Sequence, residues 1–356
     1  MKKQYKIPLI ILGVVSVLWL IALPFFYEVF FSKLFYMPFV GAVAAVVANI
    51  TPAAAGIIYF PILTHLSVAP ITVSQFNLVI QAYGMGLGTF RWFLFNRKLF
   101  IFSVLPISII GGLIGEIASM IFFPISNPEL LTLIFNFISF IFTQFIFISI
   151  IRNTQYPNRH IEMTTLSYLT ILFFSIIGGL LCGWIGFGID TIFYFVMTII
   201  FKINPAIAIV TSISLMAVMS FSGTIINFLF HDVPIELFYS ALPGVTVGGL
   251  FLAAYIAVKM GSRNILLLFT FFLSIDFFLA LWTQQTLPMS ETVRKIIIYA
   301  LVFYMLLVHI KIFRNQSKNI NASKGEFEHK DKDEQNHIKA AQQKIEAAKQ
   351  QIDCSL

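Results

Sequence analysis

Residues 48–56 read ANITPAAAG and interrupt an apolar run, FVGAVAAVVANITPAAAGIIYFPIL, that covers residues 39–63. A helix that crosses a membrane needs about 20 consecutive apolar residues, and Asn49, Thr51 and Pro52 lie in the middle of this run. Thr51-Pro52 is typical of a helix start, because a Thr side chain can cap the first turn and proline suits the first helical position. We therefore expect a helix to break within the membrane here and a new helix to begin at Pro52.

The composition around this stretch is that of a membrane protein. Hydrophobic residues make up 58% of the 356-residue chain and charged residues only 11%, whereas soluble domains carry about 25% charged residues. The two cysteines, Cys182 and Cys354, cannot build a disulfide framework or a cysteine-based metal site. We expect an all-α polytopic membrane protein that spans the lipid bilayer and uses neither a cofactor nor a metal.

The apolar segments predict eight crossing helices and two interrupted regions, at residues 35–67 and 166–203. If each interrupted region enters and leaves the membrane on one side, as a re-entrant hairpin, nearly all basic loop residues fall on the side of the N-terminus. This positive-inside bias predicts cytoplasmic N- and C-termini in the cytoplasmic (inner) membrane. The basic residues on the inner side are Lys2, Lys3, Lys6, Arg91, Arg97, Lys98, Arg152, Arg159, Lys202, Lys259, Arg263, Lys311 and Arg314.

These segments divide the chain into six parts. They are an extra N-terminal transmembrane helix (1–33), a first transmembrane repeat (35–151), a cytoplasmic linker (152–165), a second transmembrane repeat (166–283), a last transmembrane helix (284–314) and a polar cytoplasmic tail (315–356). The net charge of +7 lies entirely in residues 1–314, because the tail is balanced. That distribution is typical of membrane loops and argues against a nucleic-acid partner.

The tail contains apolar residues at a spacing of three and four, namely Ile338, Ala341, Ile345, Ala348 and Ile352. A helix with this pattern could pair copies of the chain into a homo-oligomer. The pattern covers only about two heptads, fewer than the three to four typical of a coiled coil. A solvated helix or a disordered segment is therefore the alternative.

The two halves of the membrane region carry an internal repeat. Three blocks recur in the same order: APITVSQFN (69–77) with NPAIAIVTS (204–212), GTFRW (88–92) with GTIIN (223–227), and LPISIIGGL (105–113) with LPGVTVGGL (242–250). By the charge bias, the two copies begin on opposite sides of the membrane, which predicts an inverted-topology repeat. Such repeats place the substrate site near the midplane, where interrupted helices meet. The counterpart of ANITPAAAG is GWIGFGIDT, at residues 183–191.

Two broken helices meeting at the midplane can bind an anion without a buried Arg or Lys. Free N–H groups and the helix dipole favour negative charge at a helix N-terminus. Gly186 and Gly188 allow a close approach of the backbone to a ligand, and Asp190-Thr191 can begin the matching helix. Gln81 and Ser214 join the polar lining of the Pro-led helices. The candidate substrate-binding residues are Asn49, Thr51, Pro52, Asn77, Gly186, Gly188, Asp190, Thr191, Thr211 and Ser212.

Asp190 decides between two transport mechanisms. An ionised Asp190 would repel an anionic substrate, so its protonation suggests proton–anion symport with Asp190 as the proton-coupling group. The alternative is a cation-coupled carrier or a channel of the same fold, with Asp190 as an ion ligand. An intramembrane enzyme is disfavoured, because GFGID places its Asp one residue late for an aspartyl protease motif. We expect Glu116 and Asp276 to be interhelical partners.

The order of these features resembles that of the TauE/SafE permease family, the sulfite-exporter and toluenesulfonate-uptake group. The resemblance covers residues 36–283, approximately, and depends on a broken helix, the Pro-led NPAIAIVTSISL and the later LPGVTVGGLFLAAYIAVKM. It implies a permease for sulfite, organosulfonates or related small organic acids. Two positions depart from the family pattern: NITPAAAG replaces a glycine cluster, and Asp190 stands where glycine is usual.

Overall fold

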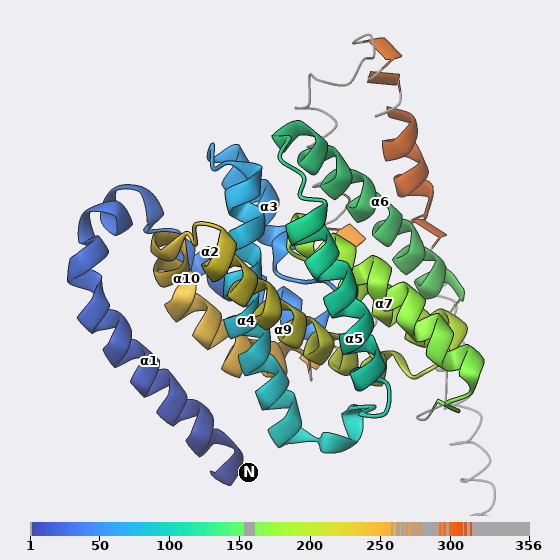
Figure 1. The fold of residues 1–356 in the computed structure, drawn as a ribbon, viewed down its shortest axis with the longest axis horizontal. Coiled ribbons are helices and arrows are strands. Elements are labelled where there is room, and N and C mark those ends of the chain that lie inside the picture. The colour runs from blue at the N-terminus through green and yellow to red at the C-terminus, as the bar shows by residue number, and fades with distance from the viewer. Residues whose placement is uncertain are drawn as a thin grey trace, which may run out of the picture. The chain divides into compact units, whose positions relative to one another are not determined.

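The computed structural model (Figure 1) divides the chain into two units, Met1–Ile298 and Tyr299–Leu356. Four predicted features lie outside the described residues: the linker at 153–160, Asp276, Cys354 and the tail at 315–356. The backbone is described for residues 2–152, 161–257, 259–260, 264, 267, 270–271, 274, 277, 292–293, 295–296, 299–308, 310–311 and 314.

The described part of the first unit is helical and contains no β-strand. Six of its helices are long and apolar enough to cross a membrane, which confirms an all-α polytopic membrane protein. Two of the eight expected crossings lie near the C-terminal end of the membrane region, at 263–283 and 292–313. The first falls largely on residues that are not described, whereas the second includes the apolar helix Tyr299–Val308. The helices are α1 (Lys2–Val29), α2 (Met37–Ile50), α3 (Gly56–His65), α4 (Pro70–Phe95), α5 (Leu105–Ile117), α6 (Pro128–Arg152), α7 (Thr165–Ile185), α8 (Ile189–Phe195), α9 (Pro205–Phe230) and α10 (Ile235–Val247).

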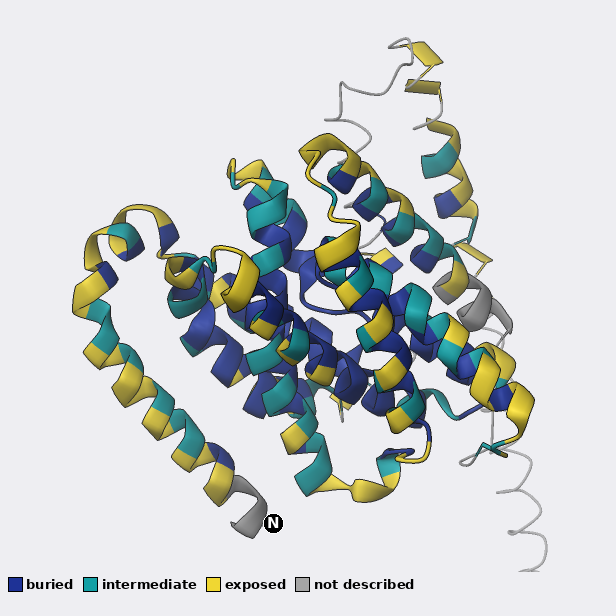
Figure 2. Ribbon diagram, viewed as in Figure 1, coloured by how far each residue is buried: buried dark blue, intermediate teal, exposed yellow. Residues whose placement is uncertain are grey.

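Helix α1 is peripheral to the first unit, and most of its surface is exposed (Figure 2). It contacts α10 through Trp19, whose indole N–H donates to the Tyr239 carbonyl at 2.8 Å, and through Phe26, which stacks on the Tyr239 ring. An apolar helix with so little buried surface is suited to a lipid environment. The buried residues gather instead where α2, α3, α4 and α9 meet (Figure 2).

Helices α4 and α9 are the central pair, and each has 26 residues. Each begins with a proline, Pro70 or Pro205, at the first helical position, where a missing N–H costs nothing. The two helices are antiparallel, because Asn227 near the end of α9 donates to the Gln75 carbonyl near the start of α4. Helices that match in sequence thus run in opposite directions, as an inverted repeat requires.

The glycines of α5 and α10 correct one part of the repeat alignment. Gly111 and Gly115 lie against backbone carbonyls of α7, whereas Gly244 and Gly248 lie against the equivalent carbonyls of α2. Gly111 therefore corresponds to Gly244, not to Gly248 as the matched LP and GGL letters predict. The error is four residues, about one helical turn. Small residues recur at this spacing wherever helices pack closely, so the letters match equally well one turn away.

Candidate functional site

The sequence predicts that a helix begins at Pro52, in the first break, and this prediction is wrong. Helix α2 ends at Ile50 and α3 begins at Gly56. Thr51 is extended (φ −124°, ψ 161°), because the residue before a proline is disfavoured in the helical conformation. Its N–H and its hydroxyl both donate to the Val47 carbonyl, at 3.0 and 2.7 Å. Thr51 therefore caps the C-terminus of α2 and leaves the N-terminus of α3 without a side-chain cap.

Four consecutive N–H groups at the first break have no hydrogen-bond acceptor among the described residues. They belong to Ala53, Ala54, Ala55 and Gly56, which are all buried. Unpaired buried N–H groups are rare in proteins and cost free energy when no ligand or water binds them. Together with the dipole of the ten-residue helix α3, they form a donor cluster suited to an anion.

The second break is made by two glycines with positive φ. Gly186 (φ +76°) ends α7, and its N–H donates to the Cys182 carbonyl at 2.9 Å. Gly188 (φ +125°) precedes α8, in a conformation that only glycine adopts without strain. Asp190 lies in the first turn of α8 and is fully buried. One of its oxygens accepts from the Gly188 N–H at 3.4 Å, and the other is buried without a hydrogen-bond partner among the described residues.

The two breaks are in direct contact. The Thr191 hydroxyl, from the second break, donates to the Pro52 carbonyl of the first at 2.7 Å. Gly56 and Phe187 also lie against each other, since a Cβ on Gly56 would be 3.1 Å from the Phe187 ring. The structure thus brings together segments more than a hundred residues apart in the chain, as the repeat predicts.

A polar face of α4 lies along both breaks. Ser74, Asn77 and Gln81 are spaced so that they share one side of the helix. The Gln81 amide donates to the Gly186 carbonyl at 2.9 Å. Asn77 lies between Gly56 and Gly186, and both polar atoms of its amide are buried without a partner.

Ser74 was not predicted from the sequence, and Gln81 was predicted only as part of the polar lining of its helix, not as a substrate-binding residue. The Ser74 hydroxyl and the Gln81 amide oxygen are also buried and unpaired. Their spacing from Asn77, three residues before it and four after it, was the available signal. The signal was weak, because polar residues on a membrane helix also bond their own backbone.

The remaining predicted residues lie in other contacts. Asn49 packs against Gly88 of α4, and its backbone carbonyl accepts from the Trp92 indole at 3.0 Å. Thr211 accepts from the Ile101 N–H at 3.2 Å and donates to its own helix. Ser212 also bonds its own helix, to the Ile209 carbonyl. Neither Thr211 nor Ser212 makes a hydrogen bond to a break within the described part of the chain.

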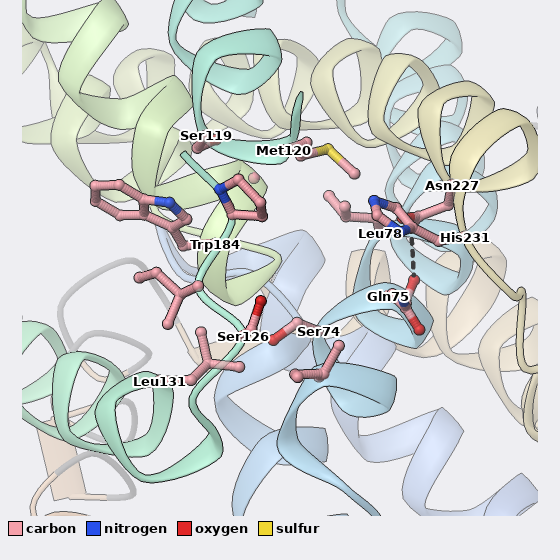
Figure 3. A pocket seen from close by; sticks show the side chains of 14 residues that line it. Ser74, Gln75, Leu78, Ser119, Met120, Ser126, Leu131, Trp184, Asn227 and His231 are labelled. Carbon is pink, nitrogen blue, oxygen red and sulfur yellow. Dashed lines mark hydrogen bonds between the residues drawn. The ribbon is translucent and has the colours of Figure 1, made fainter. Parts of the chain in front are cut away.

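Two cavities adjoin this arrangement. A small one of about 10 Å³, room for about one water molecule, lies between Asn49, Ala55, Tyr59 and Gln81. A larger one of about 190 Å³, which we call the vestibule, lies between α4, α7, α9 and the segment 119–131 (Figure 3). Ser74 lines the vestibule, and its backbone carbonyl lies against Gly186. The vestibule therefore reaches the second break from the side that the charge bias predicts to be outside.

Comparison with known proteins agrees with the resemblance seen in the sequence. The family model described as sulfite exporter TauE/SafE matches residues 37–280, almost the range expected from the motifs. Neither the curated proteins nor the solved structures give a significant match to the chain. The family match includes both breaks, the polar face of α4 and the vestibule. The chain therefore belongs to the sulfite exporter TauE/SafE family.

Proposed function

We propose that this protein is a secondary transporter that moves small anions across the cytoplasmic membrane by alternating access, with proton coupling. Membership of the TauE/SafE family implies a membrane transporter of sulfur-containing anions. Within that class, the proposed substrates are sulfite, organosulfonates or related organic acids.

The unpaired donors at the two breaks support this proposal most directly. The Asn77 amide lies between the breaks, with no hydrogen-bond partner among the described residues, and next to Gly56, the last of the four residues with free N–H groups. Each hydrogen bond to a charged group contributes about 1.5–3 kcal/mol. An oxyanion with several acceptor oxygens would pair several of these donors at once. We propose that the substrate binds between α3, Asn77 and Thr191.

Asp190 is the proposed proton-coupling group at this site. Its carboxyl group lies over the first turn of α8, where an anion would otherwise be favoured. A charged carboxylate would repel the substrate, so binding of the anion and of a proton to Asp190 support each other. This linkage is what proton–anion symport requires.

The shape of the site supports alternating access. The vestibule leads from the predicted outer face towards the second break. On the opposite side, the Trp92 indole and Gly88 hold Asn49 in place against the end of α4. An opening on one side and close packing on the other is the arrangement expected of one state in a transport cycle.

Flux into proteoliposomes tests the proposal. Radiolabelled sulfite uptake is measured with and without an inward proton gradient, in competition with a panel of sulfonates and carboxylates. We expect uptake that sulfonates inhibit and that the gradient accelerates. If only carboxylates compete, the substrate is a carboxylate and not a sulfur-containing anion. Absence of flux for every anion tested would contradict the proposed function.

A cation-coupled carrier is the second candidate, because one Asp190 oxygen is buried and unpaired. Asp190→Asn separates the two mechanisms. An anion symporter needs a neutral side chain here, so the variant should transport sulfite and lose its response to the proton gradient. A carrier that binds a cation at Asp190 would instead lose all transport, since an amide cannot replace the carboxylate charge.

A further inference from the structure

Glu116 is a second buried carboxyl group, on α5 and apart from both breaks. It is fully buried. Its carboxyl oxygens meet the Ser222 hydroxyl of α9 and, at 3.5 Å, the Cys182 thiol of α7. The hydrogen-bond partners that the described residues give this carboxyl group are a hydroxyl and a thiol, both uncharged. An isolated carboxylate charge within a membrane is costly, and such acids often have a function.

The hydrogen bonds around Ser222 favour a proton on Glu116. The Ser222 oxygen contacts both a Glu116 carboxyl oxygen and, at 2.7 Å, the Met219 carbonyl of its own helix. A serine hydroxyl has one hydrogen, and a carbonyl can only accept. If Glu116 is ionised, both acceptors share that one hydrogen. A protonated Glu116 can instead donate to Ser222 while Ser222 donates to Met219, which gives each contact its own hydrogen.

Few other groups near Glu116 can titrate. On α7 the neighbour is the Cys182 thiol, which interacts electrostatically with Glu116 and also with Asp190 of α8. On α9 the residues near Glu116 are Ser222 and Gly223, and on α4 the nearby side chain is that of Leu78. None of these residues titrates in the physiological range. Within the described residues, Glu116 is thus the acid at the junction of α5, α7 and α9.

The vestibule lies close to this acid. Its lining includes Ser119 and Met120, which follow Glu116 by one helical turn, and Gly183, which follows Cys182. The Ser119 hydroxyl donates to the Glu116 backbone carbonyl at 3.0 Å. Neighbours of Glu116 on α5 and of Cys182 on α7 therefore line the vestibule.

We propose that Glu116 is a proton-binding site of the transporter, separate from the anion site, and that its proton holds α5 against α9. The coupling role rests on the proposed function, because the proton must be linked to anion flux. Release of the proton leaves a charge at the junction and removes the hydrogen bond to Ser222. Water can then enter from the vestibule and separate α5 from α9.

Infrared difference spectroscopy tests the proton site without requiring transport. The full chain is reconstituted in liposomes at neutral pH, as wild type, Glu116→Gln and Glu129→Gln. Glu129 is an exposed glutamate at the start of α6 and serves as the matched control. We expect wild type minus Glu116→Gln to show the carbonyl stretch of a protonated acid, and wild type minus Glu129→Gln to show ionised carboxylate. Carboxylate bands alone in the first difference would overturn the proton assignment.

Exchange of labelled for unlabelled sulfite tests the coupling role. We expect the wild-type exchange rate to vary with pH, the Glu116→Gln rate to vary less steeply because the proposed proton site at Asp190 remains, and the Glu129→Gln rate to follow wild type. A Glu116→Gln profile identical to that of wild type would overturn the coupling role. If wild type exchanges no anion, the proposed function and the coupling role both fail, while the infrared result still decides the proton site.

Discussion

Asn77 is the single residue on which the anion site depends most. Its amide lies between Gly56 and Gly186 and has no protein partner. A buried amide with neither its donors nor its acceptor satisfied is costly, and a ligand that bonds to it recovers that cost. The position of Asn77 in the Pro-led helix was enough to name it as a candidate from the sequence. Its unpaired state depends on the packing of Gly56 and Gly186 around it and could not be predicted.

We predict that Asn77→Ala weakens substrate binding. The variant loses a hydrogen bond to a charged group, which contributes about 1.5–3 kcal/mol, so the KM for uptake should rise by about 10- to 100-fold. Asn96→Ala, on an exposed loop after α4, is the control and should leave KM unchanged. An Asn77→Ala KM equal to that of wild type would contradict a substrate contact at this position.

Thr191 joins the two breaks through one hydrogen bond to the Pro52 carbonyl. Thr191→Val has nearly the same shape but leaves that carbonyl buried and unpaired, at a cost of about 1–3 kcal/mol. We expect a lower melting temperature in detergent and slower sulfite uptake, whereas Thr191→Ser should keep both near wild type. If the valine variant melts like wild type, the contact between the breaks does not stabilise the fold.

At the scale of single elements, helix α4 shows how position within one helix sets the effect of a glycine. A Cβ on Gly88 would collide with the Asn49 amide, whereas a Cβ on Gly86 would meet nothing within 4 Å. Both glycines are in the helical interior, where alanine is otherwise favoured. An alanine at Gly86 therefore reports the effect of helix propensity alone, whereas an alanine at Gly88 also reports the packing of Asn49 at the first break.

We predict opposite effects for Gly88→Ala and Gly86→Ala. The first should destabilise the protein by about 1–3 kcal/mol, because it overpacks the contact between α2 and α4. The second should be neutral or stabilise by up to about 1 kcal/mol, the helix-propensity difference between alanine and glycine. Thermal unfolding in detergent measures both. Equal melting temperatures for the two variants would contradict the packing of Asn49 against Gly88.

The elements that the sequence predicts correctly are those with local signals. Pro70 and Pro205 begin helices because proline fits the first helical position wherever the preceding residue is extended. The same signal fails at Pro52, where the chain needs four more residues before α3 begins. Contacts between elements are a second limit. The Thr211 hydroxyl accepts from the Ile101 N–H, a contact that no pattern within its own helix reveals.

At the scale of the whole membrane region, the account requires the vestibule to open on the outer side. Ser126 lines the vestibule and is exposed, and Lys98 is exposed on the loop after α4. In a Cys354→Ser background, we expect a membrane-impermeant thiol reagent to modify Ser126→Cys in intact cells. Lys98→Cys should react only after the membrane is permeabilised. The reverse pattern would contradict the predicted orientation.

The inverted repeat also belongs to this scale, and its sequence signal was only partly reliable. The blocks within α4 and α9 lie in helices that run antiparallel, as the contact between Asn227 and Gln75 shows. The glycine block is displaced by one turn, because Gly111 and Gly244 share the same packing role. The order of the repeated blocks along the chain was enough to predict the arrangement of helices. The register of the glycine block could be found only from the contacts between helices.

Equilibrium binding of radiolabelled sulfite to the purified protein tests the central claim most directly, because it depends on neither coupling nor turnover. The account predicts saturable binding to wild type and to Asn96→Ala, displacement by sulfonates, and a Kd raised by about 10- to 100-fold in Asn77→Ala. Equal binding to wild type and Asn77→Ala would contradict an anion site between the two breaks.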